Sequence, residues 1–198
     1  NCNVICEKPI VIKLEHLEML KGLEKRYNKK IYTILQLRHH PVIEQMKKNL
    51  KKSRFKNKVK LEYITPRGKW YDYSWKGEYD KSGGILFNIG IHFFDMLIWL
   101  FGKPNSFSIE KKEKTVTGFL SLENADVDFK LSIDKKNLPY KDWKPYRNLT
   151  FNNKEFNFSE GFNDLHDISY KKIINGEGFG ITDVIPAIEL IENMNQND

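Results

Sequence analysis

The stretch Gly83–Gly102, GGILFNIGIHFFDMLIWLFG, constrains the fold more than any other part of the chain. It is strongly apolar and predicts a buried helix, yet Asn88, His92 and Asp95 interrupt it. Spacings of four and three place these side chains in a line on one helix face. Burying an amide, an imidazole and a carboxylate costs several kcal/mol unless they find partners. The line therefore indicates either polar packing or chemistry.

Composition narrows the class of protein. The chain has 198 residues and 40% hydrophobic residues, enough for one domain or for one domain plus part of another. Because the polar line interrupts it, the longest apolar run lacks the ~20 clean residues of a membrane span. The N-terminus shows no signal-peptide pattern, and Cys2 and Cys6 lie too far apart along a strand to bridge. We expect a reduced, cytoplasmic protein without a membrane segment.

The formal net charge of +7 suggests an anionic partner, and Lys47–Lys60 is the densest basic run. Nucleic acid is one explanation. However, the run is mostly lysine in a helical pattern, and a general bias toward Lys, Asn and Ile accounts for it. We therefore expect no nucleic-acid partner and keep that function as a weaker alternative.

The first part of the chain predicts a strand–helix–strand unit. Asn3–Cys6 is typical of a buried strand, Pro9 ends the pattern, and leucines at helical spacing continue to about Asn28. Ile31–Leu37 is an apolar β run of the kind found in parallel sheets. Because the chain begins inside a strand, we expect it to be a piece of something larger.

The rest predicts a mainly antiparallel, open-faced sheet with helices packed on one face, an α/β (α+β) fold. The expected strands are residues 58–65, 106–110, 115–122, 127–133, 147–151 and 155–158. The expected helices are residues 42–51, 83–102, 163–174 and 183–194. A loop at 66–84, rich in Trp, Tyr, Lys and Gly, is longer than most connectors and therefore a candidate for function.

Two motifs together resemble a known family. Glu7-Lys8-Pro9 ends a parallel strand, where α/β folds place ligands, and the glycine-rich helix carries Asn88-x-Gly90-x-His92-x-x-Asp95. This pairing resembles the Gfo/Idh/MocA family of NAD(P)-dependent sugar oxidoreductases. Further similar segments are Ile34–Arg38, Tyr63–Gly68, Ser74–Gly77, Lys81–Gly84 and Ser159–Phe162. They look like the WbpB/WlbA-type branch, which oxidises UDP-N-acetylglucosaminuronic acid at the sugar C3.

The resemblance implies a division of the chain. Residues 1–38 would be the last βαβ unit of a dinucleotide-binding Rossmann domain, and residues 39–198 a C-terminal substrate and oligomerisation domain. The glycine-rich loop Gly-x-Gly-x-x-Gly is not found in these 198 residues. We therefore expect the chain to be the C-terminal part of a larger enzyme, inactive alone and a poor binder of NAD.

The same resemblance implies catalytic roles for Lys8 and His92. A desolvated Lys8 would have a lowered pKa and bind or deprotonate the hydroxyl, and His92, with an ordinary pKa near ~6.5, would be base or relay. Which of them takes the proton stays open. Many family members have Asp where this chain has Asn88, so the amide is expected to orient substrate or His92. Asp95 is expected to fix the imidazole tautomer.

An anionic UDP-uronate requires cations and aromatic rings. The candidates for substrate binding are Asn88, Asp95, Arg38, Arg67, Lys76 and Lys81. Glu7, Lys8 and Gln36 are the candidates for binding NAD. With one imidazole and no well-spaced second His or Cys, no metal site is expected. His166 on a terminal helix either lines the pocket or is structural.

The sequence thus predicts the C-terminal part of an NAD-dependent nucleotide-sugar dehydrogenase of surface polysaccharide (lipopolysaccharide O-antigen) synthesis. Its C-terminal sheet is expected to form a homodimer or homotetramer, which the resemblance alone implies. Another sugar or inositol dehydrogenase of the family is one alternative. A non-catalytic binding or scaffold domain is the other.

Overall fold

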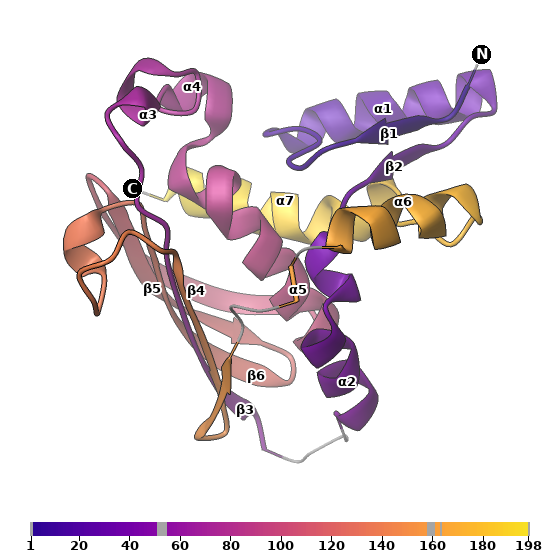
Figure 1. Ribbon diagram of the computed structural model, residues 1–198. Helices are drawn as coiled ribbons and strands as arrows, with labels where there is room; N and C mark the ends of the chain where they lie inside the picture. The colour runs from indigo at the N-terminus through magenta and orange to yellow at the C-terminus, as the bar shows by residue number, and fades with distance from the viewer. Residues whose placement is uncertain (1, 51–54, 158–160, 163, 198) are drawn as a thin grey trace.

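The strands form two separate sheets, a small one near the N-terminus and a larger one with helices on one side (Figure 1). The computed structural model describes residues 2–50, 55–157, 161–162 and 164–197. Part of the basic run Lys47–Lys60 and part of the similar segment at 159–162 lie outside the described residues.

The small sheet confirms the predicted strand–helix–strand unit. Strands β1 (Val4–Cys6) and β2 (Ile31–Thr33) pair in parallel, and helix α1 (Leu14–Tyr27) connects them. Asn28 ends α1 in the left-handed conformation, with φ of 49°, which Asn tolerates better than most residues.

Two details of this unit differ from the prediction. β1 is mostly exposed rather than buried, because it is paired on one side only in the described structure. β2 ends at Thr33, opposite Cys6, and Gln36–His39 forms a 3₁₀ turn (η1) instead of more strand. The partner strand ends there, so the ladder has nothing further to pair with.

The larger sheet has the strand order β4-β5-β6-β3-β7-β8. All neighbours are antiparallel except β3 and β6, which are parallel, so the predicted mainly antiparallel sheet is confirmed. The strands are β3 (Asn57–Ile64), β4 (Pro104–Lys112), β5 (Thr115–Leu122), β6 (Ala125–Ser132), β7 (Tyr146–Phe151) and β8 (Lys154–Asn157).

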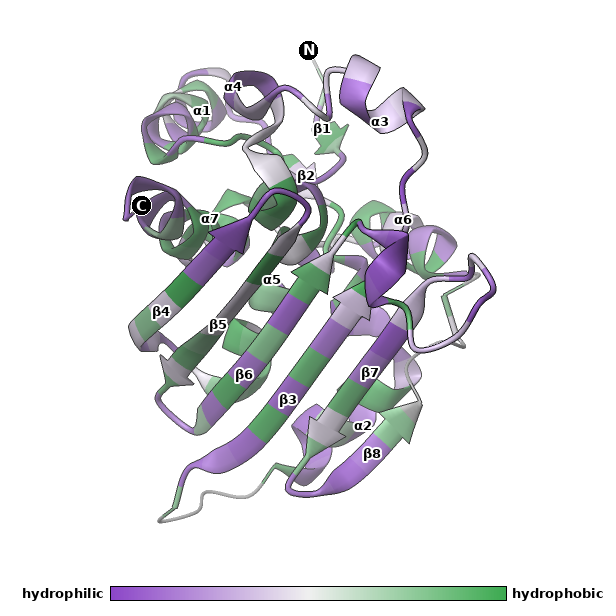
Figure 2. Cartoon of the chain, turned by 90° about the vertical axis from the view of Figure 1, so that its left-hand side faces the viewer, coloured by the Kyte–Doolittle hydropathy of each residue, from purple (hydrophilic) through white to green (hydrophobic). Residues whose placement is uncertain are grey.

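Helices cover one face of this sheet and leave the other open, as Figure 2 shows with the open face toward the viewer. Alternation sets the two faces: in β6, Val127, Phe129 and Leu131 are buried, whereas Asp128 is exposed. The helices are α2 (Pro41–Asn49), α5 (Ile91–Phe101), α6 (Leu165–Ile174) and α7 (Ile181–Gln196).

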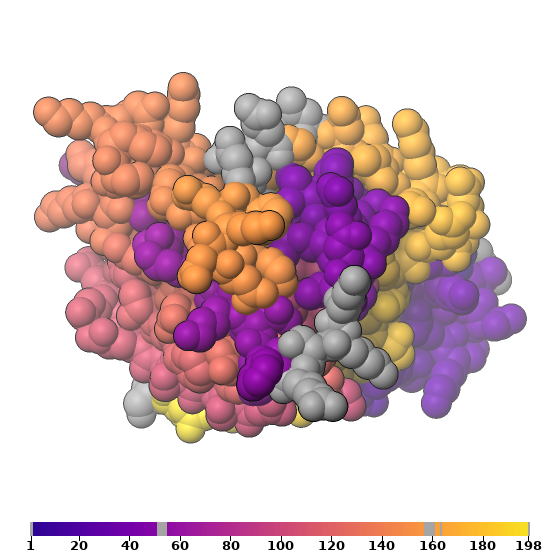
Figure 3. Space-filling model, turned by 90° about the horizontal axis from the view of Figure 1, so that it is seen from below, coloured from indigo at the N-terminus to yellow at the C-terminus, as the bar shows by residue number. Residues whose placement is uncertain are grey.

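The main apolar core joins these parts, beside a small separate cluster of Tyr32, Ile34 and Ile173. It includes Leu17 of α1 and Leu149 of β7, so the N-terminal unit packs on the same core as the sheet. Figure 3 shows the molecule from below. The purple atoms of α2 and the start of β3 lie between the orange β7–β8 hairpin and the yellow C-terminal helices, and the indigo N-terminal unit lies next to those helices. The expected boundary between residues 38 and 39 stays a prediction.

The predicted 83–102 helix is a π turn, η2 (Leu86–Gly90), followed by α5. Gly83 and Gly84 precede it with positive φ, and a Cβ on Gly83 would stand 2.3 Å from the Phe87 ring. The segment Tyr79–Phe101 is apolar and long enough to cross a bilayer, but 67% of its most apolar window is buried inside the protein. A core helix has the same composition, and this one packs behind the sheet.

The 66–84 loop contains two short helices, α3 (Trp70–Tyr73) and α4 (Tyr79–Ser82), where the sequence predicted irregular structure. Each is a single turn, too short for a clear apolar period.

Candidate active site

Lys8 is the centre of the candidate site. It follows β1, and its ammonium group donates a hydrogen bond to the main-chain carbonyl of Asn88, 2.8 Å away. The pKa of Lys8 is lowered to about 8, mainly by burial; Glu7 raises it, and Lys76 and Arg67 lower it. This agrees with the expectation of a desolvated lysine whose pKa is lowered.

Asn88 ties the functional loop to the helix. Its amide nitrogen lies 2.9 Å from the Tyr71 hydroxyl, 3.0 Å from the Lys76 carbonyl oxygen and 3.1 Å from the Ser82 hydroxyl. In a π turn, carbonyls pair five residues ahead instead of four, which shifts the helix face. Such turns are common at functional sites, and here the turn presents the Asn88 carbonyl to Lys8.

His92 lies in the first turn of α5 and is half-buried. Burial lowers the pKa of His92 well below its usual value, and the neighbouring charges of Lys8 and His166 lower it further. The imidazole is therefore neutral at pH 7, and one of its ring nitrogens can accept a hydrogen bond. His166 itself lies 3.3 Å from the Glu7 carboxylate, so α6 also reaches the site.

Positive charge around Lys8 is poorly balanced. Arg67 and Lys76 are exposed, and each lies over a neighbouring indole ring, at 5.9 Å from Trp70 and 5.7 Å from Trp75. Among the described residues, neither has a carboxylate within ion-pair distance. Repulsion among these cations costs stability unless an anion joins them.

Arg38 and Asp95 lie apart from this cluster. Arg38 Nε is 3.0 Å from Asp95 Oδ2, and Nη2 is 2.6 Å from Oδ1, with both side chains buried. Burial raises the pKa of Asp95, and Arg38 opposes the shift. Arg38 also donates to the carbonyl oxygen of Asp183 and lies over the Phe179 ring.

This geometry corrects one expectation. Both oxygens of Asp95 accept hydrogen bonds from Arg38, so the carboxylate does not fix the His92 tautomer. Tertiary packing is the cause: the turn after β2 brings Arg38 against α5. For the same reason, Arg38 is buried in an ion pair, and its contact with substrate stays a prediction.

The remaining candidates are Lys81 on α4 and Gln36 on η1. Lys81 is exposed and pairs with Glu78, 2.7 Å away. Gln36 is half-buried in η1. No group of three or more potential metal ligands occurs in the described part of the chain.

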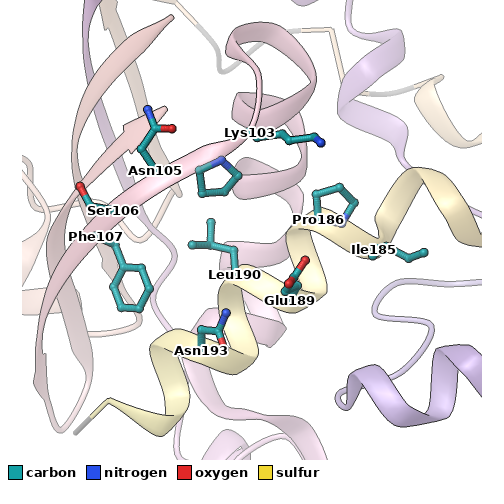
Figure 4. Close-up of a pocket in the computed structure, with 10 residues that line it drawn as sticks. Lys103, Asn105, Ser106, Phe107, Ile185, Pro186, Glu189, Leu190 and Asn193 are labelled. Atoms are coloured by element: carbon teal, nitrogen blue, oxygen red, sulfur yellow. The ribbon is translucent and has the colours of Figure 1, made fainter. Parts of the chain in front are cut away.

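A cavity of about 620 Å³ lies elsewhere, between the start of β4 and α7 (Figure 4). Pro104, Phe107, Pro186 and Leu190 give it a largely apolar lining. None of the predicted site residues lines it.

The sequence did not predict the residues that hold Asn88. They are Tyr71 and Ser82, which both belong to the long aromatic loop that the sequence marked as a candidate for function. For His166 the sequence allowed either a pocket-lining or a structural role, and its position beside Glu7 places it next to the candidate site.

Comparison with known proteins agrees with the motifs. Residues 47–124 match the model of the oxidoreductase family C-terminal alpha/beta domain, GFO_IDH_MocA_C. A structure of the WlbA (WbpB) dehydrogenase from Thermus thermophilus with NAD and alpha-ketoglutarate is 40% identical, with a TM-score of 0.93 over 99% of this chain. Another, with NAD and UDP-GlcNAcA, is also 40% identical, with a TM-score of 0.91 over 98% of this chain.

The chain spans 65% and 64% of the lengths of these two structures. The WlbA dehydrogenase from Bordetella pertussis is 17% identical, with a TM-score of 0.77 over 98% of this chain and 70% of its own, a likeness in fold alone. The chain belongs to the Gfo/Idh/MocA oxidoreductase family and corresponds to its C-terminal portion.

Proposed function

We propose that this chain forms the substrate side of an NAD-dependent dehydrogenase that oxidises the C3 hydroxyl of a UDP-N-acetylglucosaminuronic acid-like sugar. The observation that carries the proposal is the Lys8–Asn88–His92 cluster, with its lowered pKa values and surplus of positive charge. The 40% identity to a protein crystallised with NAD and UDP-GlcNAcA supports it.

The residues present fit one end of the cofactor. The carboxyl ends of β1 and β2 offer the Glu7 carboxylate, the Lys8 amine and the Gln36 amide, where α/β folds bind nucleotides. These groups would hold the nicotinamide-ribose end of NAD. The 198 residues contain no glycine-rich loop for the pyrophosphate. When bound, NAD supplies the hydride acceptor.

Lys8 and His92 handle the proton of the hydroxyl. With a pKa of about 8, roughly a tenth of the Lys8 amines are neutral at pH 7. A neutral amine that donates to the Asn88 carbonyl keeps its lone pair for the substrate hydroxyl. Neutral His92 is the second acceptor, and His166 with Glu7 connects it toward solvent.

Arg67 and Lys76 bind the uronate carboxylate. Both lie near enough to Lys8 to lower its pKa, so they are near the sugar ring that Lys8 must contact. Asn88 acts as a positioning residue through the loop, and Lys81 extends the basic rim of that loop. Arg38 and Asp95 hold the helix in place beneath them.

The wider context follows from the same proposal. The open, largely polar sheet face is the surface for a homodimer or homotetramer. The enzyme works in the cytoplasm, where nucleotide sugars for lipopolysaccharide are made.

The test is NADH formation by the native protein that contains these 198 residues. With UDP-N-acetylglucosaminuronate and NAD, the absorbance of NADH should rise and the sugar should gain a C3 ketone, seen by mass spectrometry. Oxidation of free sugars or inositol in place of the UDP-sugar would support the family alternative. Binding of the UDP-sugar without oxidation would support a scaffold role.

A further inference from the structure

We propose that Arg147, held between the rings of Tyr63 and Phe162, binds the diphosphate of the nucleotide sugar. The inference rests on the proposed function and deepens it by dividing the site. Arg67 and Lys76 serve the sugar carboxylate, and Arg147 serves the diphosphate farther from the reacting carbon.

The guanidinium of Arg147 is fixed by aromatic rings. Its central carbon lies 4.3 Å from the ring centre of Phe162 and 5.5 Å from that of Tyr63. Tyr63 and Arg147 are opposite each other in the β3–β7 ladder, so their side chains share one face of the sheet. Ring stacking holds the plane of a guanidinium while its N–H groups stay at the edge for a ligand.

Arg147 lacks an anionic partner within the described residues. No hydrogen bond or ion pair from its side chain is present there, although it is half-buried. By contrast, Arg38 is bound to Asp95, and Lys60 on β3 is bound to Glu62, 3.1 Å away. A fixed, half-buried guanidinium with free donors suits a phosphate, which accepts from the fork bidentately.

The position of Arg147 connects it to the catalytic cluster. Tyr63 lies 4.7 Å from the ring of Phe93, which follows His92 in α5. Phe162 lies three residues before α6, which carries His166. Arg147 therefore stands at the same end of the sheet as Arg67, which follows β3.

The two anionic groups of the substrate, the carboxylate and the diphosphate, are assigned to different cations by their nearness to Lys8. Arg67 and Lys76 shift the pKa of Lys8, whereas Arg147 is not among the charges that do. The carboxylate is attached to the sugar ring that Lys8 must contact. The diphosphate extends away from the ring, so it belongs with the cation that lies beyond the reach of Lys8.

The experiment is calorimetric titration of the native protein with UDP, uridine and glucuronate. Arg147→Gln should weaken UDP binding roughly 10- to 100-fold, the loss expected for hydrogen bonds to a charged group. Uridine and glucuronate should bind as in the wild type. Arg147→Lys, which keeps the charge but not the fork, should lose less. Arg26→Gln is the matched control, because Arg26 is an exposed arginine on α1 that lies 5.4 Å from the Tyr27 ring.

Three results would overturn the assignment. Unchanged UDP binding in Arg147→Gln would refute the subsite and leave the proposed function standing. Equal weakening of all three ligands, with a lower Tm in both Arg147 variants, would make the residue structural. If the wild type did not bind UDP, the proposed function would fail as well.

Discussion

Two polar clusters on one helical segment follow opposite electrostatic rules. Toward the end of the segment, Asp95 is buried and its charge is balanced by Arg38. Toward its start, Lys8 meets a neutral carbonyl while Arg67 and Lys76 add positive charge. Balanced charge holds a fold together, whereas unbalanced charge costs stability and persists where a ligand completes it. The comparison separates a structural pair from a candidate catalytic site.

The largest expected effect is on stability at the paired cluster. Asp95→Ala removes the bidentate partner of buried Arg38 and leaves it only Asp183, whose carboxylate is 3.6 Å away, so the free energy of unfolding should fall by up to about 3–5 kcal/mol. Urea unfolding measures it. The double variant Arg38→Met/Asp95→Leu should recover most of the loss. If the double variant were as unstable as the single one, the ion pair would not be the cause.

Lys8→Met should lower activity without lowering stability, the opposite of Asp95→Ala. The rate of sugar oxidation should fall by about 10³-fold, within the usual range for a general base. Stability at pH 7 should not fall and should rise by up to about 3 kcal/mol, because the folded state pays to keep Lys8 protonated.

The sign follows from proton binding. The folded pKa of Lys8, about 8, lies below its ordinary value of 10.5, so wild-type stability should rise with pH between these values. Lys47→Met is the matched control, since Lys47 is another lysine with a lowered pKa that donates to a main-chain carbonyl, that of Trp99. A comparable rate loss in Lys47→Met would break the comparison.

Asn88→Ala should give the smallest effect of the three. Its side chain holds the loop but does not supply the carbonyl that Lys8 uses, so the variant should keep most of kcat. The KM for the nucleotide sugar should rise about tenfold, and stability should fall by about 1–2 kcal/mol. Asn137→Ala is the control, because that amide also bridges two hydroxyls, of Thr115 and Ser132. A loss of kcat equal to that of Lys8→Met would contradict a positioning role.

Much of the fold could be predicted from periodicity. The antiparallel strands alternate cleanly, and strand β5 occupies the residues predicted for it. The predicted end of strand β2 was wrong, because an apolar run does not show where its partner strand stops. The π turn was not predicted either, since its extra residue leaves no mark in an apolar segment.

The candidate site was predicted in part. Lys8, Asn88 and His92 come from motifs, and the structure brings them together. Asp95 was placed with them because local spacing stacks all three helix residues on one face. Its partner Arg38 lies 57 positions away, and only the tertiary packing reveals it.

The central claim is that burial lowers the pKa of Lys8, with Lys76 and Arg67 adding to the shift against Glu7. An NMR titration of protein labelled at the lysine ε-carbon, with Lys8→Arg to assign the signal, measures that pKa directly. The account predicts a value of about 8. A value near the ordinary 10.5 would contradict it.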